Sequence, residues 1–401
     1  MRGFRFVASA FHPGLSLRHR LVVRKISWQP TNPGNVTMND LLRNQAERSE
    51  GAAAVRQLGE AVAACRAALE VHARDQSPQQ WAMAQNNLGT ALGNQAERSE
   101  GTEAVRLLGE AVAAYRAALE VYTRDQFPQQ WAMTQNNLGT AIRNQAERSG
   151  GVQAVRLLGQ AEAACRAALE VYTRDQFQQQ WAKTQNNVGN ALSNLAERSE
   201  GVLAVRLLGK AAAAYRAALE VYTREQFPQQ WAMTQNNLGT ALGNQAVRSG
   251  SALAVRLLGE AAAACHAALE VYTREQFPQD WAMTQNNLGA ALSYQAMRSE
   301  GTEAVRLLGE AAAACRAALE VYTREQFPQD WAMTQNNLGT ALGNQAARSE
   351  GAEAVRLLGE AVAAYRAALV IWTVNEFPPY HDLVANNLAE TEEALRRLQV
   401  K

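Results

Sequence analysis

Two patterns of apolar residues alternate along most of this chain, and both have helical spacing. The first is typified by residues 128–149, where Trp131, Leu138 and Ala146 recur at roughly 3.6-residue intervals after Pro128. Proline suits a first helical turn, because its missing N–H would have no partner there in any case. The second pattern covers residues 152–174. Its apolar positions are Val155, Leu157, Leu158, Ala161, Ala164, Cys165, Ala168, Leu169, Val171 and Tyr172. No stretch of either pattern alternates with a period of two, so the sequence predicts helices without strands.

The pair of patterns repeats every 50 residues. Tryptophan marks the period at Trp81, Trp131, Trp181, Trp231, Trp281 and Trp331. A Ser-Gly-Gly segment at 149–151 separates the first helix of a unit from the second. A partial copy starts near Met38 and a degenerate copy ends the chain. We therefore expect an all-α solenoid of tandem antiparallel helix pairs over residues 37–401, with seven second helices, eight first helices and a charged capping helix at about 380–399.

Glycine recurs at two slots inside the expected helices. Gly89 represents the slot in the first helix and Gly109 the slot in the second. Each costs about 1 kcal/mol of helix stability relative to alanine. Their recurrence indicates close helix crossings, although simple inheritance by duplication would also produce it.

The repeated block resembles the tetratricopeptide repeat. The matching positions are Leu88, Gly89, Ala111, Tyr115, Ala118, Leu119 and Pro128. The unit departs from that family in length, since the family period is 34 residues. The Asn-Asn-Leu string at 86–88 is also similar to the longer repeats of kinesin light chains. The resemblance implies helix pairs stacked into a right-handed superhelix, with the first helices lining a concave groove that binds peptides.

Paired asparagines are the main candidate binding residues. They are Asn86, Asn87, Asn136, Asn137, Asn186, Asn187, Asn236, Asn237, Asn286, Asn287, Asn336 and Asn337. An amide both donates and accepts hydrogen bonds, so it can bind a peptide backbone of any sequence. The resemblance implies that both slots of each pair face the groove. The alternative is that these amides join neighbouring helices of the solenoid.

Other candidates lie in the same stretch of the first helix. Thr90 and Thr140 occupy one slot that shares a helix face with the asparagines. Lys183 replaces the methionine of the Met83 slot, and Arg143 replaces the glycine of the Gly93 slot. Variation on a constant frame is how repeat proteins acquire distinct binding surfaces, and it is also what neutral drift looks like.

The sequence contains no recognisable catalytic or metal-binding arrangement, so we expect no enzyme activity, cofactor or metal. Each histidine of the array is a single variant in a repeated slot. One slot holds Cys65, Cys165, Cys265 and Cys315 in four copies and tyrosine in the others, which indicates packing and reduced thiols. Arginines and glutamates such as Arg106 and Glu110 have the spacing of helix-surface pairs and are interpreted as a solvated face.

Charge separates the first 36 residues from the array. The chain carries a formal charge of +1, which gives no reason to expect nucleic acid, and no run approaches the roughly 20 apolar residues of a membrane span. Residues 1–36 contain six basic residues and no acidic one, and without them 33 basic residues face 38 acidic ones. The segment fits a disordered tail, translated upstream sequence or an organelle transit peptide; a secretory signal fits less well.

Together these features predict a protein-interaction scaffold, cytoplasmic unless residues 1–36 direct it to an organelle, that binds a peptide or helix of a partner protein in its groove. The first alternative is a sensor or regulatory arm of a larger signalling or defence assembly. The second is an enzyme with an unrecognised site. The oligomeric state is left open.

Overall fold

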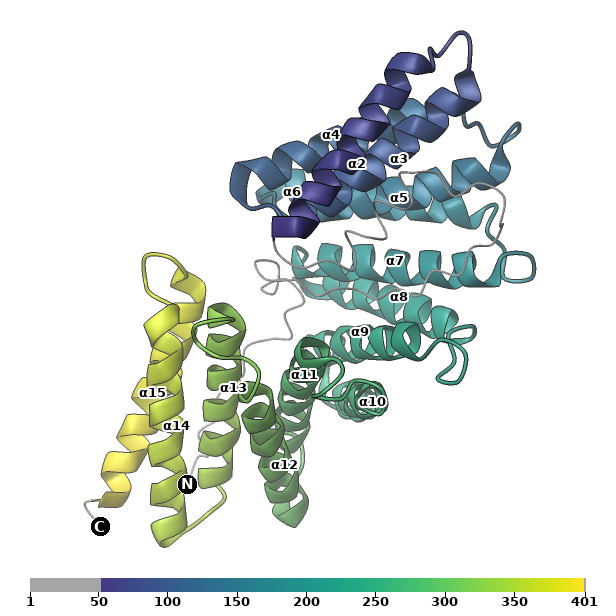
Figure 1. The fold of residues 1–401 in the computed structure, drawn as a ribbon. Coiled ribbons are helices and arrows are strands. Elements are labelled where there is room, and N and C mark those ends of the chain that lie inside the picture. Colours follow the sequence, from purple (N-terminus) through teal and green to yellow (C-terminus); the bar gives the residue numbers. More distant parts are fainter. Residues whose placement is uncertain (1–51, 400–401) are drawn as a thin grey trace. The chain divides into compact units, whose positions relative to one another are not determined.

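The computed structural model describes residues 52–399, and the helices there form two compact units, residues 52–198 and 199–399 (Figure 1). The second helices of the repeats are α2 Ala52–Val71, α4 Gly101–Leu119, α6 Gly151–Leu169, α8 Gly201–Leu219, α10 Ser251–Leu269, α12 Gly301–Leu319 and α14 Gly351–Ile371. The first helices are α3 Pro78–Glu97, α5 Pro128–Glu147, α7 Gln178–Glu197, α9 Pro228–Val247, α11 Pro278–Ala296, α13 Pro328–Ala346 and α15 Pro378–Gln399.

The predicted all-α array of helix pairs is confirmed for the described residues, which contain seven helices of each kind and no strand. The predicted segment 1–36 and the earliest first helix, near Met38, lie outside the described residues. Helix α15 occupies the position expected for the terminal cap. It packs on α14 and α13, and the fully buried Trp372 stacks on Tyr380 with ring centroids 4.8 Å apart.

The predicted second helix, 152–174, was too long at its C-terminal end. Helix α6 ends at Leu169, where the backbone tightens into bonds from Glu170 N to Ala167 O and from Val171 N to Ala168 O. Tyr172 continues the helical spacing but belongs to the following turn. Its ring lies 5.5 Å from that of Phe177, and its hydroxyl donates to Gln129 O. The turn is thus packed like a small core, which is why its residues look helical in sequence.

Glycine begins most second helices because the chain reverses there in a left-handed conformation. The backbone angle φ lies between +52° and +58° at Gly101, Gly151, Gly201, Gly301 and Gly351. Side chains rarely tolerate that region, so glycine is favoured. This turn places the first and second helix of one unit side by side.

Five of the described first helices, α3, α5, α9, α11 and α13, meet the following second helix at a glycine. A Cβ atom on Gly139 would lie 2.5 Å from Cys165 Sγ, and one on Gly89 would lie 2.8 Å from the ring of Tyr115. The same contact recurs at Gly239, Gly289 and Gly339. The close crossing of first and second helices predicted from the Gly89 slot is therefore present. The Gly109 slot differs, because the nearest atom to its added Cβ would be Gln145 Nε2 at 3.9 Å.

First helices also contact one another from repeat to repeat. In the unit of residues 52–198, α5 contacts both α3 and α7; in the unit of residues 199–399, α9, α11, α13 and α15 contact each other in succession. Within each unit, the second helices have no comparable contacts with one another. Each unit therefore has an inner side, formed by first helices, and an outer side, formed by second helices.

One helix is more apolar than the sequence analysis recognised. By length and composition alone, α10 is able to cross a membrane over Ala252–Leu269. Its apolarity comes largely from alanines, of which Ala261, Ala264 and Ala268 are buried within the fold. A search for an uninterrupted apolar run misses this helix because Arg256 and Glu260 interrupt it.

Replacing Gly139 by alanine tests the close crossing. The added methyl group would meet Cys165 Sγ and, at 2.9 Å, the carbonyl oxygen of Ala161, which belongs to the backbone and cannot turn away. We expect Gly139→Ala to lower the free energy of unfolding by about 1–3 kcal/mol, measured by urea denaturation.

Gly159→Ala is the matched control. Nothing lies within 4 Å of a Cβ added there, on the exposed side of α6. Since alanine is the better helix former, we expect this variant to gain up to about 1 kcal/mol. Equal stability changes for both variants would contradict the close crossing.

Candidate protein-interaction surface

A stripe of accessible residues runs along the first helices on the inner side, and we call it the inner stripe. In α3 it consists of Met83, Asn87, Thr90, Asn94 and Glu97, all at least partly exposed and spaced by three or four residues. This spacing keeps them on one helix face. The stripe recurs in the following first helices, where the equivalent positions become more buried toward the C-terminus: Met133 is 39% exposed and Met333 only 7%.

The two asparagines of each pair lie in different environments. The first of each pair is buried, with at most 5% of its surface exposed: Asn86, Asn136, Asn186, Asn236, Asn286 and Asn336. The second is partly exposed at Asn87, Asn137, Asn187 and Asn237 and buried at Asn287 and Asn337. Only the second asparagine of a pair therefore lies on the inner stripe.

Several of these amides are joined across repeats. Asn187 Nδ2 donates to Asn136 Oδ1 at 3.0 Å and to Thr140 Oγ1 at 3.3 Å. Asn287 Nδ2 makes the same two bonds to Asn236 and Thr240, at 3.1 and 3.3 Å. The bond between Asn337 and Asn286 repeats the pattern at 3.0 Å. These bonds support the alternative that the amides join neighbouring first helices; contact with a ligand stays a prediction.

Asn86 and Asn336 depart from this arrangement. Asn86 Oδ1 accepts a hydrogen bond from Thr134 Oγ1 at 3.2 Å instead of from an asparagine. The amide of Asn336 is fully buried and neither its oxygen nor its nitrogen has a hydrogen-bond partner. The ladder of amides is therefore regular only through the middle repeats.

Thr90 links a first helix to a second helix, whereas Thr140 links two first helices. Thr90 Oγ1 lies 3.0 Å from the hydroxyl of Tyr115 on α4 and donates to Asn86 O within its own helix. Thr140 Oγ1 donates to Asn136 O at 3.2 Å and accepts the bond from Asn187. Both are only partly exposed, so their hydroxyls are largely engaged within the fold.

The two predicted charged variants behave differently. Arg143 forms a largely buried ion pair with Glu147, and its guanidinium also donates to Asn144 Oδ1 at 2.7 Å. Glu147 in turn accepts a bond from Asn194 Nδ2, so the pair connects α5 to α7. Lys183 is exposed in the methionine slot of the inner stripe. Of the two, Lys183 is the one whose side chain is accessible from solvent.

The cysteines lie in the packed interior of the described residues. All four cysteines are free and buried. Among residues 52–399, no group of three or more histidine, cysteine, aspartate or glutamate side chains has the geometry of a metal site. Burial raises the pKa of Cys165, Cys265 and Cys315 from 9.0 to about 12. These thiols are packing residues, as their shared slot with tyrosine predicted.

An ion-pair network on the outer side was not predicted from the sequence. Arg66 pairs with Glu110 at 2.8 Å, and Arg74 pairs with Glu120 at 2.5 Å, each reaching from one repeat to the next. Glu110 is also bound by Arg106 of its own helix. Pairs three or four residues apart lie on one helix, so their spacing gives no sign of bonds between repeats. The spacings of 44 and 46 residues recur between copies, and this recurrence is the signal that would have revealed the network.

Comparisons with known proteins add little to this geometry. No protein-family model and no curated protein matches the chain. Among solved structures, it is similar to a circular tandem repeat protein with a novel repeat topology and enhanced subunit contact surfaces, at 15% identity and a TM-score of 0.33, over 90% of this chain and 95% of that one. It is also similar to the P58(IPK) TPR domain, at 13% identity and a TM-score of 0.25, over 91% of this chain and all of that one. The fold class therefore rests on the helix pairs themselves.

Replacing Asn236 by alanine tests the structural role of the buried amides. The change removes the acceptor of Asn287 Nδ2, which is buried and keeps only the bond to Thr240. We expect the free energy of unfolding to fall by about 1–2 kcal/mol, measured by urea denaturation followed by circular dichroism. The control is Asn137→Ala, at a partly exposed amide with no hydrogen bond, where a change within about 0.5 kcal/mol is expected. Equal losses in both variants would contradict the bridging role.

The buried thiols give a prediction for pH. Because burial raises the pKa of Cys165, Cys265 and Cys315, their neutral form stabilises the fold below the unfolded value of 9.0, and that contribution is lost as the pH rises toward 12. We expect the native protein at pH 8 to leave these three thiols unreacted with Ellman's reagent and the urea-unfolded protein to react fully. Rapid reaction of the native protein would show that the thiols are accessible.

Proposed function

We propose that this protein is an interaction scaffold that binds an extended or helical peptide of a partner protein along the inner stripe. The observation that carries the proposal is the exposure of methionine in a slot that recurs every 50 residues. Met83 and Met133 are 42% and 39% exposed on helices that are otherwise well packed. Methionine is flexible and polarizable, which suits surfaces that adapt to a partner.

The exposed amides supply the polar part of this surface. Asn187 uses Nδ2 for its bonds to Asn136 and Thr140 and leaves Oδ1 without a hydrogen bond. That oxygen is available to accept a backbone N–H from a peptide. The buried Asn136 would act indirectly, by holding Asn187 in one orientation. Recognition of the backbone by amides is independent of the peptide's side chains, so preference would come from the variable slots.

Lys183 is the clearest of the variable slots. It is exposed where Met83 and Met133 stand in other repeats, so it changes an apolar position of the stripe into a cationic one. A partner that follows the stripe would present an acidic or polar residue at this point and apolar residues at the methionines. Because the slots lie on packed helices, the surface is preorganised, and little entropy is lost when the partner binds.

Peptide selection on the full-length chain tests the proposal. Peptides are selected from a random library on the immobilised protein, and their dissociation constants are measured with Met133→Glu and with Val152→Glu. Both residues are exposed, Met133 on the inner stripe and Val152, at 86% exposure, at the start of α6 on the outer side. We expect Met133→Glu to weaken binding by at least about tenfold, as for a central apolar contact, and Val152→Glu to leave it unchanged.

The control variant decides where the peptides bind. Both substitutions add one negative charge at an accessible position, so general effects of charge are matched. Peptides that tolerate Met133→Glu but are lost with Val152→Glu would move the binding surface to the outer side. Failure to select any peptide above background would contradict a peptide-binding function.

A further inference from the structure

Three pairs of successive second helices share one arrangement of charge on the outer side. Between α2 and α4, the carboxylate of Glu110 lies between two guanidinium groups: Oε2 accepts from Arg66 at 2.8 Å, and Oε1 accepts from Arg106. One arginine comes from each of the two helices. Glu110 is therefore a carboxylate held in a cradle of two arginines.

The same cradle occurs twice more in the unit of residues 199–399. Between α8 and α10, Glu260 accepts from Arg216 at 2.5 Å and from Arg256 at 2.6 Å. Between α12 and α14, Glu360 lies between Arg316, at 2.6 Å, and Arg356. In all three clefts the carboxylate uses one oxygen for each guanidinium, which is a strong mode of carboxylate binding.

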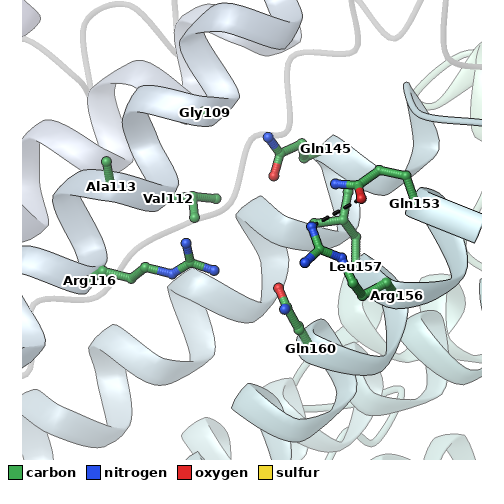
Figure 2. A pocket seen from close by; sticks show the side chains of 9 residues that line it. All are labelled: Gly109, Val112, Ala113, Arg116, Gln145, Gln153, Arg156, Leu157 and Gln160. Atoms are coloured by element: carbon green, nitrogen blue, oxygen red, sulfur yellow. Dashed lines mark hydrogen bonds between the residues drawn. The ribbon is translucent and has the colours of Figure 1, made fainter.

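The cleft between α4 and α6 has both arginines but no carboxylate (Figure 2). Arg116 and Arg156 occupy the two cradle positions, and Gln160 replaces the bridging glutamate. Arg116 forms no ion pair or hydrogen bond, and Arg156 bonds only to the neutral Gln153, at 3.0 Å. No acidic residue lines the cleft.

The cleft is also large enough to admit a group from outside. Its volume is about 340 Å³. Gly109 leaves one wall open, since nothing lies closer than 3.9 Å to a Cβ added there. The side-chain amides of Gln145 and Gln160 face the same space and have no hydrogen-bond partners, so they add donors beside the two guanidinium groups (Figure 2).

We propose that the cleft between α4 and α6 binds a carboxylate of another protein, held by Arg116 and Arg156 in the position that Glu110 takes in the cleft between α2 and α4. At three places in the same chain, the equivalent pair of guanidinium groups binds a glutamate side chain. The occupant is therefore an acidic segment of a partner protein. Val155 is exposed on α6 beside Arg156 in sequence and suits an apolar residue next to the acidic one.

This inference does not depend on the inner stripe. The cleft is formed by second helices on the outer side, so a partner bound there leaves Met133 and Asn187 accessible. Because the arginines are exposed, each ion pair with the partner contributes only modestly to the binding free energy. Stable binding therefore needs several such contacts. Failure of peptide binding at the inner stripe would leave this site untested, and the reverse also holds.

The test uses the full chain and a fluorescein-labelled peptide of Gly-Ser-Glu repeats, followed by fluorescence anisotropy. Low ionic strength of about 10 mM is used, since the Debye length is then about 30 Å. Gln160→Glu supplies the chain's own carboxylate to the cradle, as in the other clefts, and preserves the fold. We expect this variant to bind the peptide about fivefold more weakly, the factor typical of losing exposed ion pairs. Arg116→Gln should weaken binding by a similar factor.

Two further variants serve as matched controls. Gln160→Ala removes one neutral amide but keeps the two arginines and the open position between them, so it should weaken binding less than Gln160→Glu does. Glu260→Gln empties the cradle of Arg216 and Arg256, so we expect it to gain a second site of similar affinity.

Three results would overturn the proposal. The first is a dissociation constant for Gln160→Glu within a factor of about two of the wild type, although this variant blocks both arginines. The second is equal binding of a matched peptide with glutamine in place of glutamate. The third is a phosphoserine peptide that alone responds to Gln160→Glu, which would assign the cleft to phosphate.

Discussion

The contact between a glycine of a first helix and a side chain of the following second helix sets the geometry of the helix pairs within each unit. At Gly139 the helix backbone approaches so closely that Cys165 fills the place of a side chain, and at Gly89 the ring of Tyr115 does the same. The slot tolerates cysteine or tyrosine because the glycine opposite leaves room for either. With each helix pair held this closely, the first helices of neighbouring repeats contact one another on the inner side. The amide bonds and the inner stripe both depend on that proximity.

The paired asparagines illustrate how one residue type serves two purposes. Asn136 is buried and accepts a hydrogen bond from the next repeat, whereas Asn187 donates that bond and keeps its own oxygen for solvent or a partner. Neighbouring residues of a helix point about 100° apart, so one of each pair turns toward the adjacent helix and the other toward the inner stripe. The exposed asparagine of the proposed binding surface is thus held in place by a buried asparagine of the neighbouring repeat.

Most of the fold could be predicted from the sequence because its signals are local and repeated. The starts of the first helices at Pro128 and its equivalents follow from proline's preference for a first turn. The end of α6 was missed because Val171 and Tyr172 retain helical spacing while packing in a turn. The roles of Asn136 and Asn187 could not be distinguished from the sequence, since both are asparagines that recur every 50 residues. The pairing of Arg66 with Glu110 depends on how neighbouring repeats stack, and no pattern within one helix contains that information.

The bridging glutamates affect what happens when such an array loses or gains a whole repeat. Arg66 and Glu110 belong to different repeats, so the ion pair is a property of the junction and is encoded half in each neighbour. Loss of residues 151–200 would place Lys210 in the slot that Gln160 now holds and would oppose it to Arg116, cation against cation. Loss of residues 101–150 would instead join Arg66 to Gln160 and move the open cradle one position along the chain. Copies that look interchangeable in sequence therefore have a preferred order, which is recorded in the charges at their edges.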